Sequence, residues 1–154
     1  MEVTIRTAHP ADYSQIVRLI NEFALFQGVP HNVTITAEQM QQDQHLFYCL
    51  VAETEAKDLI GFATYFPAYY SWTGKALYLD DLYVKEEYRK QGVGRQLLKA
   101  VINLAKEQSC KKVRWQVSNW NTNAIAFYQN LGARVDTVEI NCDYKLSEDI
   151  PTSS

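Results

Sequence analysis

Two adjacent carboxylates, Asp80 and Asp81, lie within the segment 79–98, which reads LDDLYVKEEYRKQGVGRQLL. Carboxylates can accept a proton from a reacting group or hold a cation. The apolar residues around the acidic pair predict a β-strand, and those after Gly94 predict an amphipathic helix. The segment therefore predicts a site where a basic group and an anionic group meet on one strand–loop–helix unit.

The loop of this unit, Arg89–Gly94, has the pattern R-x-x-G-x-G. Glycines let the backbone approach a ligand closely, and the amides at the start of a helix have no partner within that helix. The pattern lacks a third glycine at Leu97, so it is not the dinucleotide fingerprint, and no Gly-Lys-Ser/Thr follows it, so it is not a nucleotide P-loop. The loop predicts a pyrophosphate site, while the alternative is a helix start packed closely through its glycines.

The alternation of the strand slips at the acidic pair. Leu77 and Leu79 share one face, and the next inward-facing residues would be Leu82 and Val84. The spacing between Leu79 and Leu82 is therefore three residues instead of two. An extra residue in a strand produces such a slip, and this predicts a β-bulge at Asp80-Asp81. The alternative is a strand that ends at Asp80.

The remaining pattern predicts one domain over residues 1–154, with a frayed tail at 151–154 and an α/β or α+β fold. Thr36 is expected to cap a short helix, with Gln39 completing a capping box. The strands are expected at Glu2–Thr7, Phe47–Glu53, Leu59–Tyr65, Ala76–Val84, Val113–Val117 and, as one or two closing strands, Val135–Leu146. The helices are expected from Pro10 to the break at Gly28, from Thr36, over Gly92–Glu107 and over Asn121–Asn130, with Gly132 as a C′ glycine.

Composition restricts the class of protein. The 154 residues are 47% hydrophobic and 21% charged with a net charge of −3, which fits a packed domain and argues against a nucleic-acid partner. Cys49, Cys110 and Cys142 are far apart, which indicates reduced thiols and a cytoplasmic protein. The histidines are not spaced as zinc ligands with these cysteines, so no metal is expected, and no apolar run is long enough to span a membrane.

Three motifs in order make the chain resemble the GCN5-related N-acetyltransferase (GNAT) superfamily: Leu82-Tyr83-Val84, the R-x-x-G-x-G loop, and Trp120-Asn121 with Ala126-Phe127-Tyr128. In that family the strand backbone at the first motif holds the pantetheine arm of the cofactor. The resemblance covers residues 3–146. It implies a central mixed, mostly antiparallel sheet of six to seven strands with about four helices, whose splayed strands form a cleft for acetyl-CoA. The cofactor-binding residues it implies are Leu82, Tyr83, Val84, Arg89, Lys90, Gln91, Gly92, Val93, Gly94, Arg95, Asn121 and Tyr128.

Within the superfamily the chain is most similar to the diamine (spermidine/spermine) acetyltransferases, through the stretch 72–81, Tyr88-Arg89 and the motifs downstream. It departs from that branch where Asp80-Asp81 replaces Glu-Asp, where Tyr70 replaces an acidic residue, and where Phe26-Gln27 replaces Tyr-Glu. Each change removes or shortens a carboxylate, so a smaller diamine or a lysine-like amine is as consistent as a polyamine. The substrate-binding residues implied are Asp80, Asp81, Trp72, Phe26 and Gln27.

The resemblance also implies a mechanism. Asp80 matches the glutamate of the branch and is the expected general base, acting through a water, while Asp81 would bind the charge of the substrate. Tyr128 resembles the general acid of the family; the alternative is a packed aromatic residue. A homodimer is expected from the branch. Two other functions stay open, acetylation of a protein or peptide amine and a non-catalytic module that binds acetyl-CoA.

Overall fold

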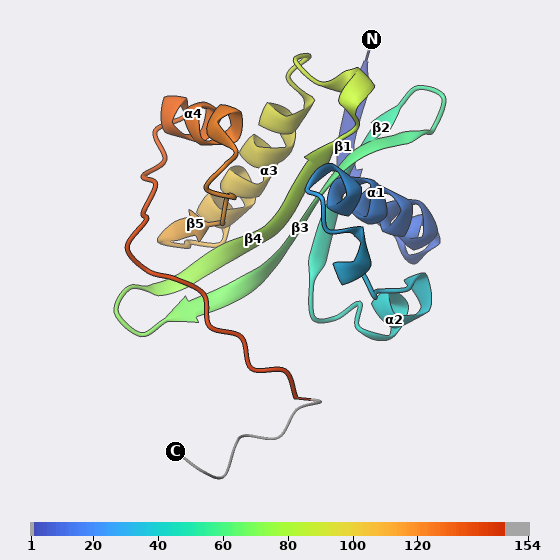
Figure 1. Cartoon of the computed structure of the whole chain (residues 1–154). Coiled ribbons are helices and arrows are strands. Elements are labelled where there is room, and N and C mark those ends of the chain that lie inside the picture. The colour runs from blue at the N-terminus through green and yellow to red at the C-terminus, as the bar shows by residue number, and fades with distance from the viewer. Residues whose placement is uncertain (1, 147–154) are drawn as a thin grey trace. The chain divides into compact units, whose positions relative to one another are not determined.

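The computed structural model describes residues 2–146 (Figure 1). The chain divides into two compact units, Met1–Gln116 and Val117–Ser154, and each is described by itself. The frayed tail expected at 151–154 lies outside the described residues. The first unit contains β1 (Val3–Thr7), η1 (Pro10–Asp12), α1 (Tyr13–Phe26), η2 (Pro30–Asn32), α2 (Ala37–Gln42), β2 (Tyr48–Thr54), β3 (Leu59–Tyr70), β4 (Gly74–Val84), η3 (Glu86–Tyr88), α3 (Val93–Glu107) and β5 (Lys112–Arg114); the second contains α4 (Thr122–Asn130).

The strands form one sheet in the order β1-β2-β3-β4-β5. The first three pairings are antiparallel and the pairing of β4 with β5 is parallel, so the sheet is mixed and mostly antiparallel, as predicted. β3 and β4 form a long hairpin, and their pairing runs out to Tyr70 and Gly74. β3 is therefore five residues longer than the alternation around Leu59–Tyr65 indicated.

The sheet has five strands where six to seven were predicted, because Val135–Leu146 forms no strand in the described part of the chain. Apolar residues do alternate there, but their side chains are exposed, Val138 and Ile140 at 85% and Leu146 at 95%. A strand is stable only when its backbone groups pair with a neighbour and one face is buried, and an alternating sequence supplies neither. The prediction of closing strands is wrong for this structure.

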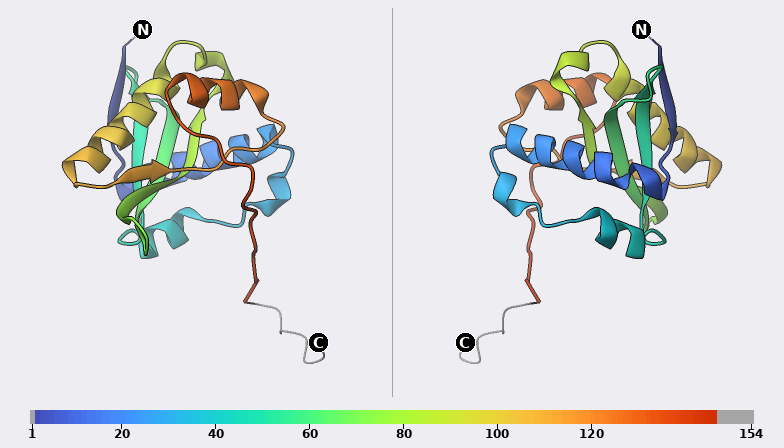
Figure 2. Two further views of the ribbon diagram at one scale, coloured as in Figure 1. Left: turned by 90° about the vertical axis from the view of Figure 1, so that its left-hand side faces the viewer. Right: turned by 90° about the vertical axis from the view of Figure 1, so that its right-hand side faces the viewer.

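Helices cover both faces of the sheet in the first unit. Figure 2 shows α1 on one side of the strands and α3 on the other. On the α1 side, Phe62 of β3 packs into the core with Tyr13 and Ile16. On the α3 side, Leu97 and Val101 are fully buried. Because successive residues of a strand point to opposite faces, the even-numbered residues of β3 from Phe62 on face α1 and the odd-numbered ones from Gly61 on face α3. Leu59 lies before a register shift at Ile60 and packs in the core on the α1 side. No helix among the described residues is both long and apolar enough to cross a bilayer.

The predicted helix starts are local features of the sequence. The Thr36 hydroxyl accepts a hydrogen bond from the amide of Gln39 at 3.1 Å, which caps α2 as expected. The side chain of Gln39 does not return to Thr36, and donates instead to Asp43 at 2.9 Å. The reciprocal half of the capping box, in which the Gln39 oxygen would accept from the Thr36 amide, is therefore absent, because this side chain is turned toward a carboxylate one turn further along.

An ion cluster joins β1, β2 and the start of α1. Arg6 donates to Asp12 at 2.8 and 3.0 Å and to Glu53 at 2.8 Å. Asp12 also accepts from the His9 amide at 2.7 Å. Hydrogen bonds from Arg6 hold the pKa of both carboxyl groups below their usual range. This cluster fixes how the first strand leads into α1, and all its charges are satisfied, which marks it as structural.

Candidate active site

The bulge predicted at the acidic pair is present in β4. Thr64 of β3 lies opposite Asp81, and the next residue, Tyr65, lies opposite Leu79. Asp80 is therefore the extra residue, with no partner across the β3–β4 ladder. A bulge of this kind re-aims the side chains next to it and leaves its extra backbone groups outside the ladder. The alternative that the strand ends at Asp80 is wrong, because β4 continues to Val84.

The two carboxyl groups of the bulge lie in different surroundings. Asp80 is exposed and Asp81 is half-buried. Burial, with a smaller contribution from the charge of Asp80, raises the pKa of Asp81 to about 6. Although Asp80 is exposed, desolvation of its carboxyl group by the surrounding protein also raises its pKa. A carboxyl group that titrates near neutral pH is suited to accept a proton from a reacting amine, so Asp81 fits the role of base better than the sequence indicated.

Beyond the acidic pair, β4 has an open edge. β5 pairs only with Ala76, Leu77 and Tyr78, so from Leu79 to Val84 the edge of β4 on the β5 side has no strand partner among the described residues. Leu82, Tyr83 and Val84, the predicted contacts of the pantetheine arm, lie on this stretch. An unpaired strand edge presents amide and carbonyl groups that an amide-bearing ligand can use.

The glycine loop turns the chain from β4 into α3. Lys90 and Gly92 both have positive φ angles, 62° and 83°, and Gly92 is the N-cap residue of α3. Lys90 is a non-glycine residue in a conformation that favours glycine, and such strain is common where a loop shapes a ligand site. Val93, Gly94 and Arg95 follow in the first turn, where amides lack helical partners. The arrangement can bind a pyrophosphate through amides and the helix dipole.

Arg89 is held in place before any ligand binds. Its Nε donates to the Val84 carbonyl oxygen at 3.0 Å. The guanidinium lies 4.5 Å from the ring centroid of Phe26 and 5.6 Å from that of Tyr83. The structure thus brings Phe26, predicted to contact substrate, against a residue predicted to contact the cofactor. Gln27 follows it as the C-cap residue of α1.

Gly61 belongs to this region, and sequence reasoning missed it. A Cβ at this position would lie 2.8 Å from the Tyr83 carbonyl oxygen, a distance that real Cβ atoms essentially never show. The signal available was a glycine inside a strand pattern, which often marks a close backbone approach. Gly61 allows β3 to pack tightly against the stretch of β4 that carries the open edge.

Trp72 does not lie near the acidic pair within one chain. It is 97% exposed at the tip of the β3–β4 hairpin. The distance along β4 from Gly74 to Asp80 is six residues, roughly 20 Å at the usual rise of a strand. Within one chain, Trp72 therefore cannot reach a substrate held at Asp80.

The second unit carries Asn121 and Tyr128. The Asn121 side chain accepts a hydrogen bond from the Ala124 amide at 3.2 Å, so it caps α4. Burial raises the pKa of Tyr128, which keeps its hydroxyl protonated at neutral pH. Gly132 has a φ of 95° just after the helix, as expected of a C′ glycine.

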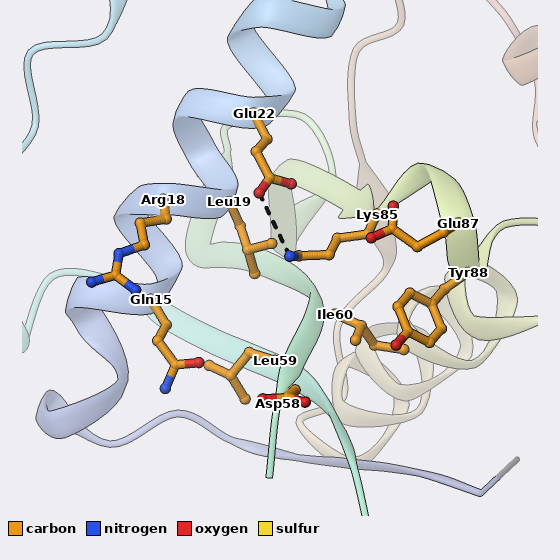
Figure 3. A pocket seen from close by; sticks show the side chains of 10 residues that line it. All are labelled: Gln15, Arg18, Leu19, Glu22, Asp58, Leu59, Ile60, Lys85, Glu87 and Tyr88. Carbon is orange, nitrogen blue, oxygen red and sulfur yellow. Dashed lines mark ion pairs between the residues drawn. The ribbon is translucent and has the colours of Figure 1, made fainter. Parts of the chain in front are cut away.

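A pocket of about 270 Å³ opens elsewhere in the first unit (Figure 3). It lies between α1 and the segments at the start of β3 and after β4, and contains an ion pair between Glu22 and Lys85 at 3.6 Å. None of the residues predicted to bind cofactor or substrate lines it. The residues that line it are Gln15, Arg18, Leu19, Glu22, Asp58, Leu59, Ile60, Lys85, Glu87 and Tyr88.

Comparison with known proteins identifies the family of the chain. Residues 14–133 match the model of the acetyltransferase (GNAT) family. The chain is 36% identical over 143 residues to thialysine N-epsilon-acetyltransferase of Sus scrofa, covering 86% of this chain and 84% of the relative. It is 37% identical over 139 residues to human spermidine/spermine N(1)-acetyltransferase-like protein 1, covering 84% of this chain but 20% of that protein.

The fold is also shared with solved structures. An aminoglycoside acetyltransferase from an uncultured soil metagenomic sample aligns with a TM-score of 0.78 at 22% identity, covering 94% of this chain and 96% of that one. The chain belongs to the acetyltransferase (GNAT) family. It is an N-acetyltransferase, and the predicted likeness to the diamine branch is confirmed. Acetyltransferases of this family use acetyl-CoA.

Proposed function

We propose that this chain transfers the acetyl group of acetyl-CoA to the terminal amine of a small basic substrate, by direct attack of the amine on the thioester. The observation that carries the proposal is the acidic bulge, where a carboxyl group with a pKa of about 6 lies beside the open edge of β4. The relatives named for thialysine and for spermidine/spermine acetylation support an amine of this kind.

In this proposal the cofactor lies along β4 and ends at the glycine loop. The stretch Leu82–Val84 holds the pantetheine arm through its backbone, and the amides of Gly92–Arg95 hold the pyrophosphate. Arg89, Lys90 and Gln91 surround that loop, with the two cations offsetting the phosphate charge. Asn121 supports the proposal as the cap of α4, which keeps the start of that helix ordered.

The acidic pair binds and deprotonates the amine. A lysine-like amine has a pKa of about 10.4 and is mostly protonated at neutral pH, so a base must take its proton before attack. Asp81 accepts that proton, and Asp80 holds the positive charge of the incoming substrate. The amine nitrogen then forms the bond to the acetyl carbon and the carbon–sulfur bond breaks. The thiolate takes a proton from the Tyr128 hydroxyl, the excess proton on the nitrogen passes through water to the tyrosine oxygen, and Asp81 releases its proton to solvent. This exchanges the roles that the sequence gave to the two aspartates.

Removing the hydroxyl of Tyr128 tests its role as general acid. We expect Tyr128→Phe to lower kcat by about a hundredfold, because the thiolate then leaves without a proton donor. Phe127→Leu, which removes a neighbouring ring that carries no hydroxyl, serves as the matched control. Steady-state release of thiol measures both variants. A decrease of only a few-fold in Tyr128→Phe would remove the general-acid role.

A panel of amines tests the reaction itself. Thiol release from acetyl-CoA should be detected with lysine, thialysine, ornithine, putrescine or spermidine, and should be far slower with a lysine residue inside a peptide. Acetyl-CoA binding without release on any amine would support a non-catalytic module instead. Faster release on the peptide would support protein acetylation.

The homodimer and the cytoplasmic location stay predictions. The net charge of −3 supports an enzyme that acts on small molecules rather than on nucleic acid. The exposure of Trp72 is consistent with a dimer, since a hairpin that cannot reach the acidic pair of its own chain can contribute to a second copy.

A further inference from the structure

Two cations gather at one aromatic ring near the end of the sheet. The Lys112 Nζ lies 4.4 Å from the ring centroid of Tyr70, and the Arg114 guanidinium lies 4.5 Å from the same centroid. Lys112 and Arg114 are two residues apart on β5, so their side chains leave the same face of the sheet. We call Tyr70, Lys112 and Arg114 the cationic cluster.

Within the described part of the chain, no ion pair neutralises the positive charge of this cluster. Among residues 2–146, no carboxylate lies within 4.0 Å of either cation. A ring face attracts a cation only weakly compared with a carboxylate, and two like charges at one ring repel each other. The cluster therefore has the charge and the donors to bind an anion, which would relieve that repulsion.

The cationic cluster and the acidic bulge share one face of the sheet. Tyr70 and Phe66 are even-numbered residues of β3, as is Thr64, which pairs with Asp81. Tyr78 pairs with Phe66 on one side and with Arg114 on the other. The rings of Phe66 and Tyr78 stack at 5.3 Å, and both lie between the cluster and the bulge.

The separation of the two charged groups is that of a small molecule. From Tyr78, which is level with Arg114, to Asp81 is three residues of β4, roughly 10 Å at the usual rise of a strand. Burial is the main cause of the raised pKa of Tyr78. The charge of Asp80 raises this pKa further and the charge of Arg114 lowers it, so the hydroxyl lies within the influence of both the acidic bulge and the cationic cluster. The Arg114 side chain extends from the level of Tyr78 toward Tyr70, so its guanidinium lies further from Asp81 than this backbone distance, and an extended lysine-like molecule is needed to span the two groups.

We propose that Lys112 and Arg114 bind the α-carboxylate of an amino-acid substrate whose distal amine is held at Asp80 and Asp81. This inference rests on the proposed acetyl transfer and names the substrate class of that same site. The planar guanidinium of Arg114 can donate two parallel hydrogen bonds to a carboxylate, and Lys112 adds a point charge. The apolar chain of the substrate crosses the stacked rings of Phe66 and Tyr78.

The same arrangement disfavours polyamines. A polyamine extending along this face from the acidic bulge would bring a second ammonium group against Lys112 and Arg114, and like charges at close range disfavour binding. Tyr70 contributes to this selectivity, because its ring collects the two cations where the diamine branch is expected to place an acidic residue. An acidic residue there would favour a second ammonium group instead.

The test compares substrates that differ only in the carboxylate. Thiol release is measured with L-lysine against cadaverine and with L-ornithine against putrescine, for the wild-type chain, Arg114→Gln, Lys112→Gln and the double variant. Lys99→Gln, an exposed lysine of α3 on the opposite face of the sheet, is the matched control. We expect wild type to favour the amino acid of each pair. The double variant should raise KM for lysine at least about tenfold, as the loss of one charge-assisted contact predicts, while KM for cadaverine stays the same or falls.

Three outcomes separate the possible failures. If the variants lose activity equally on lysine and cadaverine, the cations support the fold and do not bind the carboxylate. If wild type favours cadaverine over lysine, the proposal is wrong even though acetyl transfer stands. If none of the amines supports thiol release by the wild-type chain, the proposed function fails, and the inference fails with it. A KM for lysine that is lower in Arg114→Lys than in Arg114→Gln would further support a contact that depends on charge.

Discussion

Replacing Asp81 by asparagine is expected to lower kcat/KM for the amine by about a hundredfold to ten-thousandfold, the range that a general base contributes. The wild-type rate should fall as pH decreases through about 6, because the carboxyl group is then protonated and cannot accept the proton of the amine. This acidic limb should be absent in Asp81→Asn. Profiles of log kcat/KM against pH for both proteins measure the change. If Asp80→Asn abolishes the limb and Asp81→Asn keeps it, the base is Asp80, as the sequence first indicated.

The same substitution should stabilise the fold at neutral pH. The pKa of Asp81 is raised from 3.8 to about 6, so the folded state binds this proton more tightly than the unfolded chain does. The stability it contributes is therefore full below about pH 4 and is lost as pH rises through 6. An asparagine never carries the charge, so at pH 8 the variant should be more stable by on the order of 1 kcal/mol. Urea unfolding at pH 8 and pH 4 checks this, and an equal effect at both values would contradict it.

Gly61→Ala should weaken both the fold and the use of acetyl-CoA. The added Cβ would lie 2.8 Å from the Tyr83 carbonyl oxygen, so β3 and β4 must separate locally. Overpacking of this kind costs about 1 to 3 kcal/mol of stability. Because Tyr83 lies on the open edge of β4, KM for acetyl-CoA should rise, while KM for the amine changes less. Thermal unfolding and steady-state kinetics measure the two effects.

Gly94→Ala is the control for Gly61→Ala. A Cβ at Gly94 would be 3.7 Å from Val84, an ordinary contact, and the residue lies within α3. Its stability should be equal to or above that of wild type, because alanine favours a helix more than glycine does. If both variants lost stability equally, the close approach at Gly61 would not be the cause.

The parts of the site that lie within one stretch of chain could be predicted from the sequence. The slip between Leu79 and Leu82 predicted the bulge, since side-chain alternation along a strand is a local property. The cap at Thr36 and the turn into α3 at Gly92 depend on a few neighbouring residues in the same way. These elements were predicted with boundaries close to those observed.

The parts that depend on distant segments could not be predicted. Nothing local to Gly61 indicates that Tyr83 lies above it, and the meeting of Tyr70 with Arg114 depends on the register of β3, β4 and β5. The pKa of Asp81 follows from burial, which pattern alone does not give. The closing strand expected over Val135–Leu146 failed for the same reason, because alternation predicts a competent strand but not its partner.

The bulge has a consequence for how this sheet tolerates changes of length. The pairs Phe62–Tyr83 and Phe66–Tyr78 lie on the same face, with four steps between them on β3 and five on β4. If β4 lacked Asp80, both pairs would belong to one regular ladder, and neither would move to the other face of the sheet. The hairpin could therefore fold without this residue. Regular pairing of β3 with β4 does not need Asp80, and in the proposed function this residue holds the charge of the substrate beside Asp81.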